Sequence, residues 1–167
     1  RGAFNDTPAQ TLGGHVIAAA VERAGVEPGE VQDVIMGAAL QQGATGHNTA
    51  RQCALRAGLP VTVPAMSVDR QCSSGMMAIG IAAKQIIADG MTIAVGGGLE
   101  SISLVQNDKM NRHRVKDPWL VEHRPDVYMT MIETAETVAE RYGISREAQD
   151  EYALKSQQRT AAAQEAG

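Results

Sequence analysis

The sequence predicts an α/β domain, because short apolar runs alternate along the chain with segments of helical character. Three runs that contain β-branched residues have the length of strands: 33–40, 63–68 and 91–95. Apolar residues at helical spacing, bounded by helix start and stop residues, predict helices over 7–25, 48–58 and 72–88. Strands separated by helices form a sheet that is largely covered on both faces, and we expect such a sheet here.

Residue types define both ends of the first expected helix. Thr7 followed by Pro8 supplies a capping hydroxyl and a proline in the first turn, and Gly25 supplies a C-terminal stop. The residues that follow helical spacing are Leu12, Val16, Ala19, Ala20 and Arg23. His15 lies inside this helix, where we expect a packed or exposed histidine rather than a catalytic one.

The second expected helix contains Cys53. Asn48 can cap this helix, and its apolar face consists of Ala50, Cys53, Ala54 and Ala57. Because Cys53 falls on the packing face, we expect its thiol in the core rather than in a reactive site.

The third expected helix is the most informative segment, because it begins at Cys72. Residues 76–88 contain only Lys84 and Gln85 as charged or strongly polar side chains, a pattern typical of a helix buried nearly all round. Residues 73–75 are small, and the N-terminal end of a helix favours an anion such as a thiolate, the reactive form of cysteine. On position alone, Cys72 is either an activated nucleophile or a small core cysteine.

The remaining segments give weaker signals. Gly96-Gly97-Gly98 lacks the spacing of a phosphate-binding loop, so we interpret it as a tight strand exit. Residues 106–129 lack periodicity and carry charges and prolines, which indicates a long loop. Helical signals return from Ile132 to Gly143, and Ser145 can cap a last helix.

Composition and charge narrow the class of protein. A net charge of −4 and 3% aromatic residues argue against nucleic-acid binding through a basic surface or through stacking. Residues 109–116 are basic; we interpret them as a solvated loop, with attraction for an anionic ligand such as a nucleotide phosphate as the alternative. No apolar run has the length of a membrane span. The two cysteines form neither a metal-ligand spacing nor a CxxC pair, so we expect no metal and a reducing, cytoplasmic location.

Three stretches resemble motifs of the thiolase family. VDRQCSSG at 68–75, followed by GGGLES at 96–101, resembles the family's nucleophile region, which usually reads VNR-x-C-x-SG and then GGMES. The segments 33–60 and 134–167 are similar to the family's upstream and downstream segments, so that the match covers nearly the whole chain. In one departure, Asp69 stands where the family usually has asparagine, which places a carboxylate near the cysteine.

The resemblance implies an acyltransferase that acts on CoA thioesters. Such an enzyme cleaves 3-ketoacyl-CoA by thiolysis or, in the reverse reaction, joins acetyl-CoA units by Claisen condensation, and a cysteine acyl-enzyme forms either way. Cys72 matches the family's nucleophile. The partners implied are acyl-CoA and CoA, with CoA as a substrate and no cofactor bound permanently.

The resemblance also implies roles for residues in CoA binding and in subunit assembly. Met131 matches a methionine that lines the family's pantetheine channel, although core packing suits the residue as well, and Thr130 stands where biosynthetic members have histidine. Asn48, Arg51 and Gln52 match a segment that usually lies at the family's dimer interface; locally they indicate a capped, solvated helix start. We therefore expect a homodimer or a homotetramer.

The resemblance also implies the domain organisation. It predicts a mixed sheet with a buried central helix, covering one of two similar half-domains and part of an inserted loop domain. Residues 1–103 would form the N-terminal half-domain with the nucleophile, and residues 104–167 would begin the CoA-contacting loop domain. The histidine and second cysteine of a thiolase belong to GHP and C-x-GGG motifs, which this chain lacks. We therefore expect the C-terminal half-domain outside this span, and the span alone to be inactive.

Two alternatives stay open. A β-ketoacyl synthase-like condensing enzyme uses the same kind of cysteine together with two histidines. A non-catalytic thiolase-like module that binds acyl-CoA is the other alternative, and Asp69 is the residue that favours it.

Overall fold

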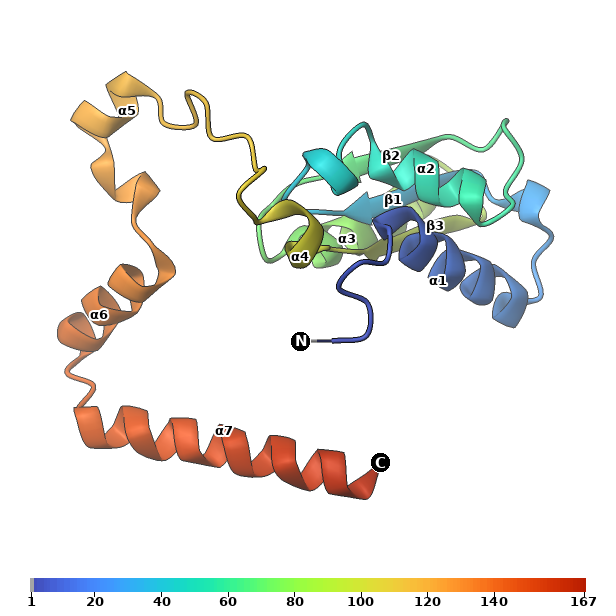
Figure 1. Cartoon of the computed structure of the whole chain (residues 1–167). Helices are drawn as coiled ribbons and strands as arrows, with labels where there is room; N and C mark the ends of the chain where they lie inside the picture. Colours follow the sequence, from blue (N-terminus) through green and yellow to red (C-terminus); the bar gives the residue numbers. More distant parts are fainter. Residues whose placement is uncertain (1) are drawn as a thin grey trace. The chain divides into compact units, whose positions relative to one another are not determined.

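The computed structural model describes residues 2–167, which divide into two compact units. The first unit ends at Arg112 and the second is His113–Gly167, whereas the boundary implied by the family resemblance follows residue 103. The first unit contains the sheet and the helices that cover it, whereas helices alone form the second (Figure 1).

The first unit is built around a three-stranded sheet with the strand order β2-β1-β3. The strands are β1 (Asp33–Gly37), β2 (Ala65–Val68) and β3 (Ala94–Gly98), and β1 pairs with both neighbours in parallel. The predicted α/β class is therefore confirmed. The expected mixed sheet is corrected within residues 2–167, where every strand pair is parallel because a helix connects each strand to the next.

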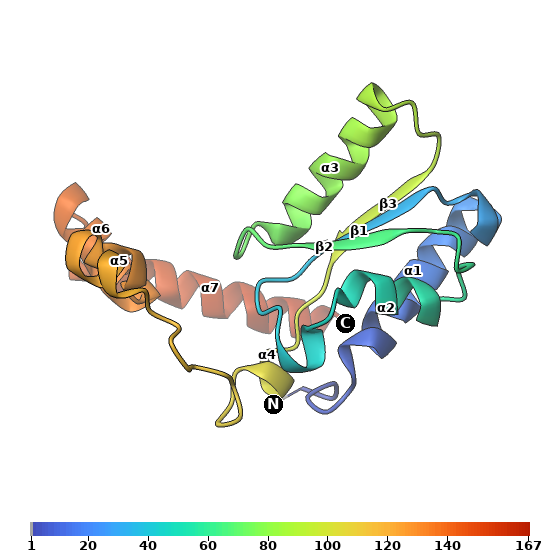
Figure 2. The ribbon, with the colours of Figure 1, turned by 90° about the horizontal axis from the view of Figure 1, so that it is seen from above.

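Helices cover both faces of this sheet (Figure 2). The helices α1 (Ala9–Ala24) and α2 (Thr49–Arg56) lie on one face, and α3 (Ser74–Ala88) lies on the other. Every residue of β1 is buried, as expected for a central strand covered on both sides. Its side chains alternate between two cores, with Val34 and Met36 on the α1 and α2 side and Ile35 on the α3 side.

The face that α1 buries differs from the apolar spacing in its sequence. The helix ends at Gly25 in the left-handed conformation, as predicted, but the predicted cap by Thr7 is wrong: Pro8 occupies the N-cap and no side chain caps the helix. Its buried side, however, includes Gly13 and Gly14, while Val16 is 52% exposed. A Cβ on Gly13 would lie 2.9 Å from Leu99 Cδ2 and would collide with the sulfur of Cys53 on α2. Glycines thus form the contact between the two helices, and a search for apolar side chains does not detect them.

The third strand is shifted along the sequence from the predicted 91–95. Gly96-Gly97-Gly98, which we interpreted as a strand exit, lies within β3 itself. A Cβ on Gly96 would lie 2.9 Å from Ile79 Cα in α3, and one on Gly97 would lie 3.3 Å from the sulfur of Met36. Glycine forms strands poorly, which draws a propensity-based prediction away from these positions. The close approach of neighbouring backbone and side chains is the reason for their presence.

The helix α3 is buried on one face rather than all round. Ala78 and Ala82 are buried against the sheet, whereas Met76, Ile79 and Ile87 are 74%, 56% and 82% exposed. The expectation of a fully buried helix is therefore corrected for the described residues, because the sheet covers only the side with the small residues. The exposed side is also apolar, and for this reason the sequence pattern predicted burial of the whole helix.

The segment predicted as a long loop, 106–129, contains two short helical elements. They are α5 (Pro118–His123) and the 3-10 turn η3 (Pro125–Tyr128), and the short helix α4 (Ile102–Val105) lies just before the segment. Asp117 caps α5, since its Oδ1 accepts a hydrogen bond from the backbone N–H of Leu120 at 2.9 Å, and Pro118 occupies the first helical position. This start signal is present in the sequence, but the helix is too short to show periodicity.

The last two helices begin and end close to the predicted residues. Thr130 and Glu133 form a capping box at the start of α6 (Met131–Tyr142), and Gly143 ends it with φ 63°. Ser145 caps α7 (Arg146–Ala166) by accepting a hydrogen bond from the N–H of Ala148 at 3.2 Å. Within residues 2–167, no helix combines the length and the apolar character required to cross a membrane. Two further 3-10 turns, η1 (Pro28–Glu30) and η2 (Gly43–Thr45), complete the elements.

The contact between α1 and α2 gives a stability prediction. We expect Gly13→Ala to lower the free energy of unfolding of the complete polypeptide by about 1–3 kcal/mol, because the added methyl group overpacks the contact with Cys53 and Leu99. His15→Ala on the same helix is the control; its side chain is exposed, so the change should stay within about 0.5 kcal/mol. Urea unfolding monitored by circular dichroism measures both, and equal stabilities for the two variants would contradict the tight contact.

The capping box of α6 gives a pH prediction. The pKa of Glu133 is lowered because its carboxylate accepts hydrogen bonds from the backbone N–H of Thr130 and from the Thr130 hydroxyl, both at 2.8 Å. The box therefore stabilises α6 above the ordinary glutamate pKa and loses its contribution as the pH falls through the lowered value. An NMR titration of the Glu133 side chain should show this lowered midpoint, and Thr130→Ala should raise it. Thr134→Ala is the control, since the Thr134 hydroxyl donates to the Thr130 carbonyl instead; equal midpoints in both variants would refute the box.

Candidate active site

The turn that carries Cys72 lies at the edge of the sheet where the parallel strands end. It connects Val68, the last residue of β2, to Ser74, the first residue of α3. In the sheet register, Gly37 pairs with Val68 on one side and with Gly98 on the other, so the three strands end side by side. Open α/β sheets bind their ligands at the carboxyl ends of their strands.

Cys72 is exposed and precedes the helix rather than beginning it. The sequence predicted a helix start at Cys72, whereas Ser73 occupies the N-cap and the first helical residue is Ser74. Gln71, just before Cys72, has a left-handed φ of 47°, so the chain is still in the turn at this point. Because its thiol is exposed, the interpretation of Cys72 as a core cysteine is wrong, and an accessible thiol beside a helix N-terminus is what the structure contains.

Hydrogen bonds from side chains determine the shape of this turn. Asp69 Oδ1 accepts a bond from the backbone N–H of Gln71 at 2.7 Å. Ser74 Oγ accepts from the N–H of Arg70 at 2.8 Å and donates to the carbonyl oxygen of Gln71 at 2.6 Å. Ser73 Oγ donates to the carbonyl oxygen of Arg70 at 2.9 Å. Cys72 therefore lies on a turn that is held by side-chain hydrogen bonds from residues before and after it.

A cleft of about 650 Å³ opens at Cys72. The segments that follow the three strands, together with the first turn of α3 and with α4, form its walls. The lining residues are Gly37, Ala38, Ala39, Leu40, Gln71, Cys72, Ser74, Gly75, Gly98, Leu99, Glu100, Ile102 and Gln106. The cleft brings together residues from distant parts of the sequence around a single thiol.

Three glycines bring the start of α3 into direct contact with the strand ends. A Cβ on Gly98 would lie 3.0 Å from Gly75 Cα and 3.2 Å from the carbonyl oxygen of Gly37. A Cβ on Gly37 would overlap the backbone of Ser74 and Gly75. Any side chain at Gly37 would thus displace the first turn of α3, and with it the turn that carries Cys72.

Glu100 connects two walls of the cleft. Its Oε2 accepts hydrogen bonds from the backbone N–H groups of Ala39 at 2.7 Å and Leu40 at 3.3 Å, which joins the segment after β3 to the segment after β1. The hydroxyl of Thr45 donates to the carbonyl oxygen of Leu40 and holds the same segment from its other side. Sequence reasoning did not assign a role to Glu100 or Thr45; a glutamate directly after a strand end was the signal available for the first, and none pointed to the second.

Cys53 lies in the core, as its position in the sequence predicts. Burial raises the pKa of the Cys53 thiol, and the contact of its sulfur with Thr49 Oγ1 at 4.0 Å opposes this only in part. The two cysteines therefore differ in access, since Cys53 is buried and Cys72 is exposed.

Met131 is the first residue of α6 in the second unit and is 72% exposed, so it is not a core residue of the described chain. The basic segment 109–116 is solvated, as expected, except that Met110 is half-buried. Lys116 in this segment places its ammonium group 5.5 Å from the centre of the Tyr128 ring. His123 stacks on Trp119 with ring centres 4.4 Å apart, so its ring has a packing role within α5.

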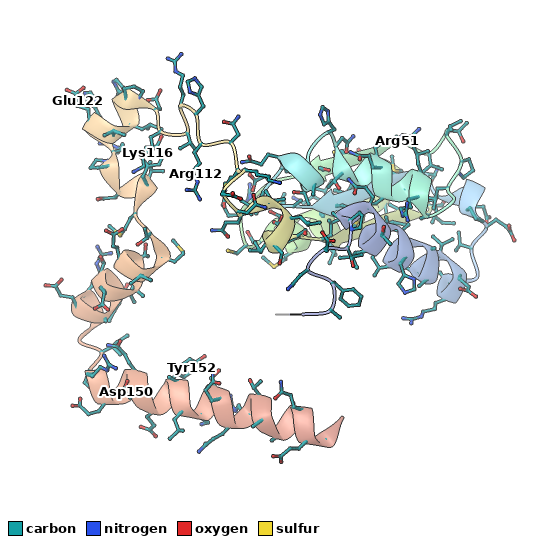
Figure 3. All side chains as sticks on the ribbon, viewed as in Figure 1. Arg51, Arg112, Lys116, Glu122, Asp150 and Tyr152 are labelled. Atoms are coloured by element: carbon teal, nitrogen blue, oxygen red, sulfur yellow. The ribbon has the colours of Figure 1, made fainter. Side chains whose placement is uncertain are left out.

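The side chains of Asn48, Arg51 and Gln52 fasten loops within the first unit. Asn48 caps α2 and donates from Nδ2 to the carbonyl oxygen of Ala65 at 2.9 Å. Arg51, which projects from α2 in Figure 3, donates to the carbonyl oxygens of Val61, at 2.9 Å, and Val63. Gln52 donates to the carbonyl oxygen of Gly46 at 3.0 Å. The predicted cap by Asn48 is confirmed. The three side chains also form hydrogen bonds to loop carbonyl oxygens, which a simple solvated helix start does not need.

Known proteins resemble this chain in sequence over almost its whole length. A family model described as "Thiolase, N-terminal domain" matches residues 1–167. An acetyl-CoA acetyltransferase of Cupriavidus necator is 45% identical over 176 residues, and a probable acetyl-CoA acyltransferase of Staphylococcus aureus is 40% identical over 176 residues. Each alignment covers 99% of this chain and 44% of the relative, so the chain spans less than half the length of these relatives.

A solved structure agrees with the sequence comparison. The crystal structure of the Bacillus anthracis acetyl-CoA acetyltransferase is similar to this chain with a TM-score of 0.83 and 40% sequence identity. The superposition covers 99% of this chain and 44% of that one. The predicted thiolase-like fold is thereby confirmed.

The contrast between the two cysteines gives a labelling prediction. A short pulse of iodoacetamide at about pH 7 should alkylate Cys72 first, because its thiol is exposed, while Cys53 is buried and its pKa is raised. Peptide mass mapping of the folded protein measures both sites, and unfolding in urea is the control that should make them equal. Faster labelling of Cys53 in the folded protein would refute the assignment of Cys72 as the reactive thiol.

Proposed function

Since this chain belongs to the thiolase family, we propose that the protein containing it transfers acyl groups on CoA thioesters through an acyl-enzyme at Cys72. The observation that carries the proposal is the exposed thiol of Cys72 in the cleft where the three strands end. Relatives named acetyl-CoA acetyltransferase and probable acetyl-CoA acyltransferase support CoA thioesters as the substrate class.

In the degradative direction, the thiolate of Cys72 forms a bond to the keto carbon of a 3-ketoacyl-CoA. When the tetrahedral intermediate collapses, the bond between the keto carbon and the α-carbon breaks. The electron pair stays on the α-carbon of the departing acetyl-CoA, which takes up a proton. The thiol of free CoA, on losing its proton, then attacks the acyl-enzyme, forms acyl-CoA and releases the Cys72 thiolate. In the synthetic direction the same steps run in reverse from acetyl-CoA.

The start of α3 suits the charge that develops in this reaction. The attacked carbonyl oxygen becomes negative in the tetrahedral intermediate, and N–H groups at a helix N-terminus stabilise an anion. We assign the backbone N–H of Cys72 as one donor to this oxygen. Histidine and a second cysteine are absent from the cleft lining formed by residues 2–167, so we assign proton transfer to residues outside this chain.

We assign residues 1–103 to the half-domain that provides the nucleophile and residues 104–167 to the beginning of the loop domain. Met131 is the residue we assign to the pantetheine arm of CoA; its exposure at the start of α6 supports this role. By the same family argument, we propose that the complete protein is a homodimer or a homotetramer.

The test is acyl-enzyme formation in the complete polypeptide. Incubation with acetyl-CoA should add one acetyl group to Cys72, detected by peptide mass spectrometry, and thiolysis of a 3-ketoacyl-CoA should proceed at steady state. Cys72→Ser should abolish the adduct and lower kcat by several orders of magnitude, whereas Cys53→Ala should retain both because the Cys53 thiol is not in the cleft. Residues 1–167 alone should not turn over, since they lack the proton-transfer partners.

The same measurements distinguish the proposed enzyme from the two alternative functions. Binding of acyl-CoA without any Cys72 adduct would replace the enzyme by a non-catalytic binding module. Condensing activity without thiolysis would favour the β-ketoacyl synthase-like enzyme. Equal turnover by residues 1–167 and by the complete polypeptide would contradict the assignment of the proton-transfer groups to the remainder of the protein.

A further inference from the structure

Gln71, the residue before Cys72, has an unusual backbone conformation. Its φ of 47° lies in the left-handed region, which is unfavourable for a residue with a Cβ atom. Glycine is the common occupant of such positions, yet this turn uses glutamine. A local interaction must therefore hold Gln71 in this conformation.

The backbone of Gln71 is fixed at both ends. Its N–H donates to Asp69 Oδ1 at 2.7 Å, a short bond to a charged acceptor. Its carbonyl oxygen accepts from the N–H of Ser74 at 3.0 Å and from Ser74 Oγ at 2.6 Å. This carbonyl belongs to the peptide group whose nitrogen is that of Cys72. Hence the contacts of Gln71 set the direction in which Cys72 leaves the turn.

Of these contacts, the one that engages the N–H of Gln71 is the bond that this N–H donates to Asp69 Oδ1, while both others engage its carbonyl oxygen. Ser74, which donates to the carbonyl oxygen of Gln71, is the first residue of α3. The carboxylate of Asp69 is exposed, so it contributes through its bond to Gln71 rather than through packing.

We propose that Asp69 is a positioning residue for Cys72: its side-chain oxygen holds Gln71 in the left-handed conformation and thereby aims the thiol into the cleft. This inference rests on the proposed acyl transfer at Cys72. The role requires an oxygen acceptor and not a negative charge, so the side-chain carbonyl of asparagine can fill it. Asp69 in place of the family's usual asparagine is therefore compatible with catalysis and gives no support to a non-catalytic module.

The test is a double-mutant cycle in the complete polypeptide, with kcat/KM for thiolysis and the rate of Cys72 acetylation as readouts. Asp69→Asn should stay within about threefold of wild type, because the acceptor is retained. Asp69→Ala should lower both rates about 10- to 100-fold through misplacement of the thiol. In the Gln71→Gly background, the loss caused by Asp69→Ala should shrink to about threefold or less, because glycine adopts a positive φ without help.

Asp89→Ala is the matched control, since it removes an exposed carboxylate at the other end of α3 and should leave both rates unchanged. An equal loss from Asp69→Ala in both backgrounds would overturn the proposal, as would a loss of tenfold or more in Asp69→Asn. If Asp69→Ala does not fold, the Asp69→Asn result and the Asp69→Ala/Gln71→Gly variant still decide between these outcomes.

Crystal structures of Asp69→Asn and Asp69→Ala separate this inference from the proposed function. Gln71 should keep its positive φ in the first and lose it in the second, with Cys72 displaced. A positive φ at Gln71 in Asp69→Ala would refute the positioning role whatever the activity. Loss of the conformation together with a wild-type protein that never acquires an acetyl group would refute the acyl transfer and leave the role of Asp69 in shaping the turn intact.

Discussion

The start of α3 touches the ends of β1 and β3 with no side chain between them, and the rest of the site is arranged around this contact. Gly37, Gly75 and Gly98 leave the space that the helix backbone occupies. A buried residue tolerates little change of volume, since protein interiors are close-packed. The position of Cys72 is therefore a consequence of packing between backbone elements, and the polar contacts of its turn refine an arrangement that the glycines make possible.

The same kind of contact occurs on the opposite face of the sheet, where Gly13 lets α1 approach Cys53 of α2. Helices cover both faces of β1, whose residues are all buried. With 3% aromatic residues, the chain fills its core mainly with alanine and valine rather than with large rings. Small residues allow short distances between layers, and short distances in turn bring the loops at the strand ends together around one thiol.

The sequence was sufficient for the fold class, most helix ends and the position of Cys72 at a strand-to-helix turn, because caps, stop glycines and alternating elements are local signals. It was insufficient where glycine is needed because it has no side chain. The buried face of α1 and the strand segment Gly96-Gly97-Gly98 both depend on close contacts with residues distant in sequence. The bond of Asp69 to Gln71 and the bonds of Glu100 to the segment after β1 depend on backbone direction, which residue type alone does not specify. The exposed side of α3 was missed for another reason, since an apolar pattern does not reveal which side the sheet will cover.

The strand order β2-β1-β3 has a consequence for how the chain acquires its site during synthesis. Ribosomes release the N-terminal part first, and β1 is the strand to which both later strands add. A nascent chain that has released β2 and Cys72 still lacks Gly98 and Glu100, so one wall of the cleft does not yet exist. The thiol thus emerges before the cleft beside it is complete. The last wall forms only when β3 pairs with the second edge of β1, which makes that late pairing the step that completes the cleft at Cys72.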